Sequence, residues 1–243
     1  MIPACPVCEK LTLVRFECAR DHDGNVTDIL QCRSCLALFN DRAHECLKQK
    51  NLQDIQFTDY YAHEVTTHAQ ETGRLEEKAQ ILDYLYGKVQ RPYETLTFCD
   101  FGAGPGYVAM AASKRFRRSF VCEFDTRAAE RACRILGRPD NLHIIRSLDE
   151  LPGPVDVMCM WHVLEHIPWP LAFFEANRSR FAPGCVFFVQ CPGYRPNAVV
   201  DCHYTFFNEP SIRCLFEKVG AKEIEIGFDI HNGFIGYLGQ LAC

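Results

Sequence analysis

The stretch Leu-Thr-Phe-Cys-Asp-Phe-Gly-Ala-Gly-Pro-Gly, residues 96–106, decides the fold of this chain. Its apolar run has the length and composition of a buried parallel strand, three glycines follow at alternate positions, and residues 107–112 begin an amphipathic helix. Glycine has no Cβ, so the backbone can turn sharply and approach a ligand closely. The helix N-terminus then presents N–H groups and a positive dipole end. The stretch predicts an α/β fold with a nucleotide-type cofactor site.

The spacing of this loop differs from the dinucleotide fingerprint Gly-x-Gly-x-x-Gly. Here the pattern is Asp-x-Gly-x-Gly-x-Gly, with Asp100 before the glycines. An aspartate at that place would repel a pyrophosphate, but it can order the loop or receive an ammonium group. Residues 120–125 predict a second strand, and Glu123 falls where an acid clasps the two hydroxyls of a ribose.

On these motifs the sequence resembles the class I S-adenosylmethionine-dependent methyltransferases, from roughly Tyr60 to the C-terminus. The resemblance implies a Rossmann-like sheet of strand order 3-2-1-4-5-7-6, with S-adenosyl-L-methionine as cofactor. It also implies that Ser147 and Leu148 meet the adenine, with either the Ser147 hydroxyl or Asp149 as partner of its exocyclic amine. Arg74, at the start of a predicted helix, is either a candidate for the cofactor carboxylate or a surface residue. The tyrosine pair at residues 60–61 either lies over the cofactor as a lid or packs an interdomain seam. The expected cofactor-binding residues are Tyr61, Asp100, Gly102, Ala103, Gly104, Gly106, Tyr107, Glu123, Phe124, Ser147, Leu148, Trp161 and His162.

The rest of the chain supplies the elements that such a sheet requires. Apolar runs and helical periodicity predict strands at 142–145, 155–160 and 184–190, and helices at 74–89, 128–136, 171–181 and 208–219. The segments 223–228 and 234–238 flank His231-Asn232-Gly233, which is a hairpin signal. A terminal antiparallel hairpin belongs to the class I methyltransferase sheet and is lacking in an NAD-binding fold.

Acid–base residues are expected after the fourth strand, in the segment Trp-His-Val-Leu-Glu-His at 161–166, because ligands of open α/β sheets bind beyond the carboxyl ends of the strands. We expect His162 to lie beside the methyl group as the base, with Glu165 and His166 bracing the loop. Quinone-pathway O-methyltransferases have a similar Glu-x-x-Glu-His that can hold a divalent ion. The histidine in place of the first glutamate weakens a magnesium interpretation, because hard cations prefer oxygen ligands.

Two further features bear on catalysis. The pattern His-x-x-Glu-His also matches an inverted zinc-hydrolase motif, but here it follows a strand and precedes Pro168 instead of lying on a helix. The long connection 192–209 is expected to close over the substrate, with His203 and Tyr204 as alternative bases. Structural roles for His166 and His203 remain open alternatives. The candidate catalytic residues are His162, His166, His203 and Tyr204.

Two Cys-x-x-Cys pairs near the N-terminus predict a structural zinc ribbon. Cys5, Cys8, Cys32 and Cys35 lie in two tight turns separated by 23 residues, so that two thiolates from each turn complete a tetrahedral shell. Short strands are expected at 12–16 and 26–31. A redox function is disfavoured because no βαβ pattern surrounds either pair. Alternative ligands are Cys18, His22, His44 and Cys46.

Composition places the chain among ordinary globular proteins. Its 243 residues suit one good-sized domain with a small appendage, and we expect a zinc ribbon at 1–48, a linker and covering helix at 49–90, and the methyltransferase domain at 91–243. The sequence contains no secretion signal and no run long enough for a membrane span. The 15 cysteines are therefore expected in a reducing cytoplasm.

The predicted function is methyl transfer to a small hydroxylated acceptor such as a sugar, a nucleotide-sugar or a secondary metabolite. One alternative is an RNA methyltransferase whose ribbon grips nucleic acid, which the net charge of −5 and the lack of a basic stripe disfavour. Another is a non-catalytic module that retains the cofactor fold. No membrane partner is expected, and the sequence leaves the oligomeric state open.

Overall fold

The computed structural model of this protein describes residues 4–20, 24–47, 64–195, 199, 202–229 and 233–242. The chain divides into two compact units. The first, which we call the glycine-loop unit, consists of Phe57–Trp161 and Ser179–Phe188. The second, which we call the cysteine unit, combines Met1–Gln56, His162–Arg178 and Val189–Ala242. The N-terminal cysteine pairs therefore share a unit with the C-terminal part of the chain.

Seven strands form one sheet of order β10-β11-β8-β7-β4-β5-β6. Counted in chain order from β4, this is 3-2-1-4-5-7-6, so the predicted sheet is confirmed. The terminal strands β10 and β11 pair antiparallel, as the hairpin signal predicted. The strands are β4 (Thr97–Phe101), β5 (Arg118–Cys122), β6 (Leu142–Ile145), β7 (Val155–Trp161), β8 (Phe181–Pro192), β10 (Ala221–Asp229) and β11 (Phe234–Leu241).

The strands of the glycine-loop unit run parallel around β4. Phe101 pairs with Cys122 of β5, Asp100 pairs with Cys159 of β7, and Cys122 pairs in turn with Ile145 of β6. Strands buried on both faces need a nearly continuous apolar sequence, and β7 has one, with six of its seven residues buried. The carboxyl ends of these four strands meet at one edge of the sheet.

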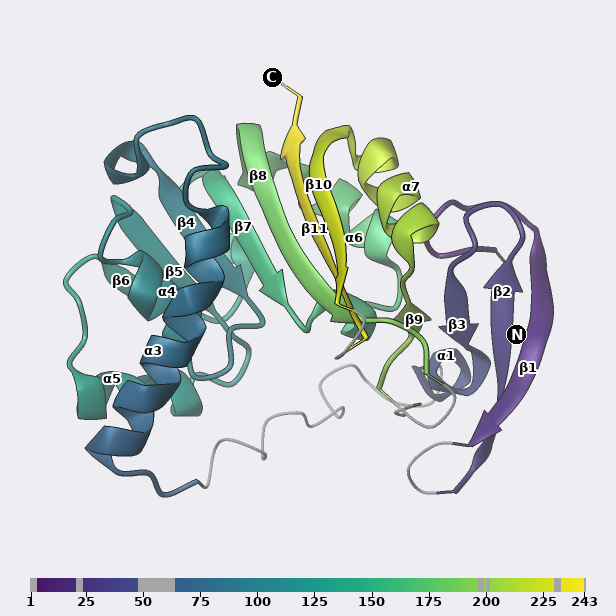
Figure 1. Ribbon diagram of the computed structural model, residues 1–243, viewed down its shortest axis with the longest axis horizontal. Coiled ribbons are helices and arrows are strands. Elements are labelled where there is room, and N and C mark those ends of the chain that lie inside the picture. Colours follow the sequence, from purple (N-terminus) through teal and green to yellow (C-terminus); the bar gives the residue numbers. More distant parts are fainter. Residues whose placement is uncertain are drawn as a thin grey trace. The chain divides into compact units, whose positions relative to one another are not determined.

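Within its described residues, the glycine-loop unit contains the α-helices α3 (His68–Leu85), α4 (Tyr107–Ala112) and α5 (Arg127–Leu136). In Figure 1, α3 lies alongside α4, and the two helices pack together. Helix α3 begins at His68, earlier than the predicted start at residue 74, because Thr67 and Gln70 form a capping box there. Gln70 donates its backbone N–H to Thr67 Oγ1 at 3.3 Å and accepts the Thr67 N–H at 2.8 Å.

The helix predicted at 171–181 is shorter than expected. The observed helix α6 (Pro170–Ala176) is followed by one 3-10 turn, η5 (Arg178–Arg180), and Phe181 already begins β8. The side chain of Phe181 is buried, and its ring lies 5.1 Å from the ring of Phe187 in an edge-to-face contact. Helical periodicity in the sequence continued into a residue that instead packs within the sheet.

Helix α7 (Glu209–Val219) agrees closely with the prediction. Its N-cap Asn208 accepts the Ser211 N–H at 3.0 Å, and Ser211 Oγ accepts the Asn208 N–H at 2.9 Å. The helix ends at Gly220 in the left-handed conformation with φ of 85°, where glycine has no Cβ penalty. Helix α7 and the 3-10 helix η4 (Leu164–His166) both belong to the cysteine unit.

The cysteine unit contains a second, four-stranded sheet of order β1-β2-β3-β9. Its strands are β1 (Leu13–Arg20), β2 (Val26–Cys32), β3 (Leu38–Asn40) and β9 (Thr205–Phe206), and helix α1 (Asp41–Leu47) follows β3. The two expected ribbon strands are present but longer than predicted, whereas β3, α1 and β9 were not predicted. Leu38 pairs with Phe206, so a strand from the long connection completes the ribbon sheet.

Candidate active site

The glycine loop follows β4 and has the conformation that its sequence requires. Gly102, Gly104 and Gly106 all have positive φ, of 67°, 53° and 79°. At Gly106 a Cβ would lie 2.6 Å from Cγ2 of Val121, so close packing excludes any side chain there. Gly106 is also the N-cap of α4, which places the free N–H groups of a helix start at the end of the loop.

Asp100 lies beneath the loop, and its side chain is almost fully buried. Burial raises its pKa to about 7, although hydrogen bonds from Cys159 and from the backbone of Ala109 act in the opposite direction. The contact with Ala109, in the first turn of α4, links the strand end to the helix start. Of the two roles open at the sequence level, this geometry corresponds to ordering of the loop.

Glu123 follows β5 and lies against the glycine loop. Its Oε2 accepts the backbone N–H of Gly104 at 2.8 Å, and burial raises the pKa of its carboxyl group. The next residue, Phe124, is 61% exposed, which is unusual for a large aromatic side chain. A carboxylate and an exposed ring thus stand side by side at the edge where the strands end.

The other expected cofactor residues of this unit follow neighbouring strands. Ser147 precedes η3 (Leu148–Glu150), in which Leu148 is buried. Trp161 is the last residue of β7, and its ring lies 5.5 Å from that of Phe188. Because the four strands are parallel, the structure brings these residues to the same edge as the glycine loop. Tyr61 lies outside the described residues.

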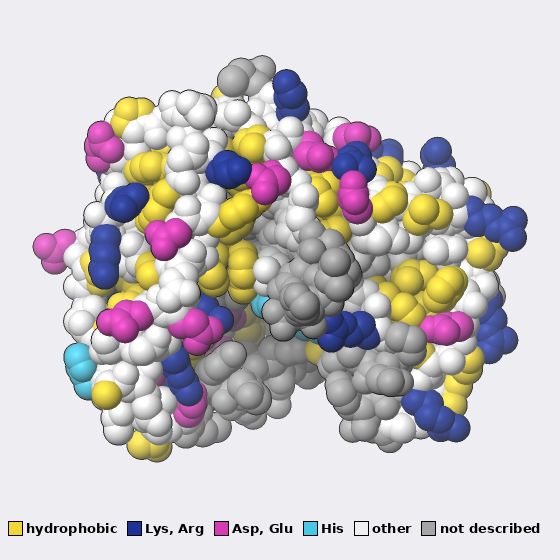
Figure 2. Space-filling model, in the orientation of Figure 1, with side chains coloured by type: hydrophobic (Ala, Val, Ile, Leu, Met, Phe, Trp, Pro, Cys, Tyr) yellow, Lys and Arg dark blue, Asp and Glu magenta, His cyan; other side chains and the backbone are white. Residues whose placement is uncertain are grey.

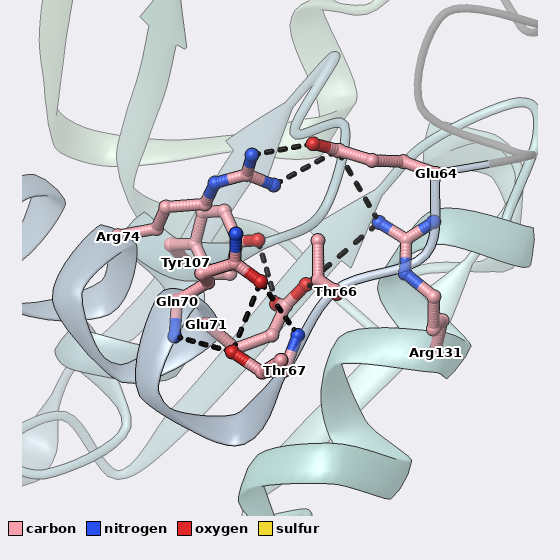
Figure 3. Close-up of polar contacts among 8 residues, drawn as sticks. All are labelled: Glu64, Thr66, Thr67, Gln70, Glu71, Arg74, Tyr107 and Arg131. Carbon is pink, nitrogen blue, oxygen red and sulfur yellow. Dashed lines mark hydrogen bonds and ion pairs between the residues drawn. The ribbon is translucent and has the colours of Figure 1, made fainter.

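A network of polar side chains joins the start of α3 to the start of α4 (Figure 3). Glu71 is fully buried and accepts the hydroxyl of Tyr107 at 2.6 Å. Its other oxygen accepts the Thr66 hydroxyl and lies 3.9 Å from Arg131. Burial and the Glu71 carboxylate raise the pKa of Tyr107 to about 12, so this hydroxyl remains a donor. Tyr107, an expected cofactor residue, therefore anchors the glycine loop to α3.

Arg74, the candidate for the cofactor carboxylate, is paired within the protein. It donates from both terminal nitrogens to Glu64, with the Nη1 to Oε2 distance at 2.8 Å (Figure 3). Such a bidentate fork is the geometry in which arginine binds carboxylates. The hydrogen bonds from Arg74 lower the pKa of Glu64. Glu64 and Glu71 were not predicted as site residues, although the capping box at 67–70 marks the helix start that lies between them in the sequence.

The candidate catalytic residues all lie in the cysteine unit. His162 directly follows β7 and has φ of 57°, in the left-handed region that is uncommon for residues other than glycine. Its backbone N–H donates to Gln190 O at 2.8 Å. Its Nδ1 lies 3.7 Å from Oε1 of buried Glu165, and the Nε2 of His166 lies 3.8 Å from the same oxygen. Backbone strain that the surrounding structure maintains is typical of functional sites.

His166 and His203 come together although they are far apart in the sequence. Their ring centroids are 4.7 Å apart, and His166 Nδ1 lies 3.0 Å from the carbonyl oxygen of Cys202. Tyr204 is buried, with its ring 5.3 Å from His44, and its backbone N–H donates to Glu165 O at 2.8 Å. The structure thus gathers the segments 162–166 and 202–204 around Glu165.

The four predicted cysteine ligands form a buried cluster whose sulfur atoms all lie within 4.8 Å of one another. Cys5 and Cys35 sulfurs are 3.5 Å apart, and those of Cys8 and Cys32 are 3.6 Å apart. The two turns are alike: the residue after each pair has φ near +64° (63° and 64°) and donates its N–H to the carbonyl of the first cysteine at 2.8 Å. This is a closed four-thiolate set that fits zinc.

The alternative metal ligands are not members of this cluster where the structure describes them. Cys18 is exposed on β1. His44 packs against Trp169 and Tyr204, and burial lowers its pKa to about 4. His22 and the side chain of Cys46 lie outside what the structure describes. His44 is not a member of the four-cysteine cluster, and its ring packs among aromatic side chains.

The comparisons with known proteins agree with this architecture. A family model described as a methyltransferase domain matches residues 60–226. No curated protein matches the sequence. A chain from the complex between the Haloferax volcanii Trm112 methyltransferase activator and a methyltransferase is similar in structure, with a TM-score of 0.57 at 18% identity over 72% of this chain and 94% of that chain.

Two further solved structures share the fold. The Burkholderia thailandensis 1,6-didemethyltoxoflavin-N1-methyltransferase, with bound 1,6-didemethyltoxoflavin and S-adenosylhomocysteine, has a TM-score of 0.53 at 16% identity over 70% of this chain and 78% of that chain. An O-methyltransferase family 2 protein from Planctomyces limnophilus, in complex with apigenin, has a TM-score of 0.55 at 13% identity over 71% of this chain and 60% of that chain. At these identities the likeness concerns the fold.

Proposed function

Because this chain belongs to the methyltransferase-domain family, it is an enzyme of methyl transfer, and we propose that its donor is S-adenosyl-L-methionine and its acceptor a small hydroxylated molecule such as a sugar, a nucleotide-sugar or a secondary metabolite. The observation that carries the proposal is the edge formed by the glycine loop and Glu123. A backbone that excludes a side chain at Gly106 and a carboxylate that contacts Gly104 suit an adenosyl ligand.

The cofactor residues follow from this edge. The glycine loop, at residues 102–106, would receive the amino-acid part, and Glu123 the ribose hydroxyls. Phe124, Ser147 and Leu148 would contact the adenine. Bound S-adenosylmethionine supplies a methyl group that is already electrophilic on its sulfonium. The protein then needs to align an acceptor with that carbon and remove a proton from the acceptor.

We assign the role of base to His162. It is the residue after β7, whose carboxyl end is at the same edge as the loop after β4, and its strained backbone marks it as functionally constrained. Glu165, with its Oε1 3.7 Å from the His162 Nδ1, orients the imidazole. In this assignment His162 would accept the proton of the acceptor hydroxyl, and S-adenosylmethionine held at the glycine loop and Glu123 would supply the methyl group.

A small acceptor is favoured over nucleic acid by charge. The net charge is −5, and over the glycine-loop unit Figure 2 shows basic and acidic side chains interspersed. Examples are the pairs Lys78–Glu77 and Arg127–Asp125. Nucleic-acid binding needs a continuous basic stripe instead. The two solved structures with bound small molecules named above share the fold. Among the described residues, no helix is both long and apolar enough to cross a membrane.

We also propose that the cluster of Cys5, Cys8, Cys32 and Cys35 holds a structural zinc ion. Four thiolates close the coordination shell, so no position remains for a substrate. The turns already hold the sulfurs close together, and metal binding would release the protons that the thiols now share. The zinc would then supply folding energy to the cysteine unit.

Calorimetry tests the cofactor proposal. Titration with S-adenosylmethionine or S-adenosylhomocysteine should release heat at one site per chain, and NAD should give none. Gly106→Ala should weaken binding at least tenfold, because its Cβ would collide with Val121. Gly137→Ala is the matched control, since Gly137 also has a positive φ, of 85°, but no atom lies within 4 Å of the place that its Cβ would occupy. Uptake of NAD without uptake of S-adenosylmethionine would refute the proposal.

A further inference from the structure

We propose that His166, Cys202 and His203 form a second metal site, which takes a transition-metal ion of the zinc type and is distinct from the four-cysteine cluster. One ligand atom of each residue lies within 4.8 Å of the others, and all three residues are half-buried. Metal–ligand bonds of 2.0–2.3 Å imply ligand separations of about 3.3–3.7 Å in a tetrahedron. Since 4.8 Å is an upper limit, the three ligand atoms need to approach one another by no more than about 1.5 Å around an ion.

The hydrogen bonding of His166 supports this role. Its Nδ1 lies 3.0 Å from the carbonyl oxygen of Cys202, so Nδ1–H donates to that oxygen and Nε2 carries the lone pair. Histidines that bind metals typically donate their other ring N–H to a backbone carbonyl or a carboxylate, which fixes the tautomer and the ring orientation. The contact also holds His166 next to the segment that supplies the other two ligands.

A buried carboxylate beside the cluster gives independent evidence for a cation. Glu165 is 1% exposed, and its Oε2 has no hydrogen-bond partner among the described residues. Its ion-pair partners, at 3.7 and 3.8 Å, are the imidazoles of His162 and His166, which carry charge only when protonated. Buried carboxylates are otherwise paired with a cation or bound to a metal. An ion held by His166 would balance the charge of Glu165.

The ligand types select the metal. Two imidazoles and one thiolate suit zinc and its neighbours in the transition series, whereas magnesium requires a shell of oxygen ligands. Three protein ligands leave one position open for water or an acceptor oxygen, as in catalytic zinc sites. That last role rests on the proposed methyl transfer, but binding of the ion does not.

Metal analysis of the full chain tests the site. The wild-type protein, loaded with zinc and passed through a desalting column, should hold two zinc ions per chain, and Cys202→Ser and His203→Ala should each hold one. Cys214→Ser is the matched control, because Cys214 is a half-buried cysteine of the same unit outside the cluster, and it should keep two ions. In the cobalt-substituted protein, Cys202→Ser should remove part of the thiolate-to-metal absorption.

A wild-type protein with one ion, or Cys202→Ser with two, would overturn the proposal. Cys202→Ser changes a single atom, so it decides the question even if His203→Ala unfolds. Thermal melting of each variant verifies the fold. Calorimetry with S-adenosylmethionine on Cys202→Ser should match the wild type, because the residue is not part of the glycine loop. Loss of the second ion with normal cofactor binding therefore separates this inference from the proposed function.

Discussion

The glycine-loop edge and the cysteine unit depend on sequence over very different ranges. The loop, the first turn of α4 and Glu123 all come from residues 97–124, one continuous stretch. In the cysteine unit, β3 pairs with β9, so Leu38 lies opposite Phe206. The first region is fixed by local spacing, and the second by segments that meet only when the chain has folded. A destabilising substitution should therefore have local effects in the first region, and in the second region it should also destabilise segments that are distant in the sequence.

The largest expected effect is removal of metal from the four-cysteine cluster. Structural zinc contributes on the order of 10 kcal/mol, which exceeds the stability of many whole domains. We expect Cys32→Ser to lose the ion and to abolish amide-exchange protection in β1, β2 and also β9. The exposed Cys18 provides the control variant, Cys18→Ser, which should keep both the ion and the protection. If amide protons of β9 remain protected after the metal is lost, the cysteine unit does not depend on contacts between distant segments in the way this comparison requires.

A smaller effect is expected from pH at the glycine-loop edge. Burial raises the pKa of Asp100 from 3.8 to about 7, so the protonated carboxyl favours the folded state. Its contribution is fully present below pH 4 and is lost as the pH rises towards 7, by up to about 4 kcal/mol. Relative to Asp100→Asn, the wild-type free energy of unfolding should therefore fall over this range.

Urea denaturation between pH 4 and pH 7 measures this difference. The exposed carboxylate of Asp149 gives the control, Asp149→Asn, for which the difference from the wild type should stay nearly constant. If the free energies of unfolding of the wild type and Asp100→Asn change in parallel with pH, Asp100 does not have the raised pKa of a buried acid.

The smallest effect concerns the link between α3 and α4. Glu71→Leu and Tyr107→Phe should each lower the free energy of unfolding by about 1–3 kcal/mol, because the first removes the acceptor of the Tyr107 hydroxyl and the second removes the donor to the buried Glu71 carboxylate. The double variant should cost less than the sum, since both changes remove one hydrogen bond. Glu76→Gln, on an exposed part of α3, should change little. Additive effects in urea denaturation would show that the two residues do not act together.

Much of the glycine-loop unit was predictable because its signals are local. The strand before the loop and the acid at Glu123 each have a spacing that one element imposes on its own residues, and the same holds for the hairpin after Gly220 in the cysteine unit. The helix starting at His68 shows the limit, because apolar periodicity alone placed it near Arg74. Its capping box was visible in the sequence as Thr67 and Gln70, and it would have corrected the boundary.

The sequence by itself determined the strand–turn–helix at 97–112 and the two alike cysteine turns, since short-range periodicity and glycine conformation are properties of neighbouring residues. The order of the seven-stranded sheet was predicted only through the resemblance of these motifs to the class I methyltransferases. Only the tertiary structure decided that β9 completes the ribbon sheet, that Glu71 receives Tyr107, and that His203 meets His166. Those pairs join residues far apart in the chain. No local pattern encodes such a meeting, because it depends on the path of the whole chain and on which buried polar groups find partners there.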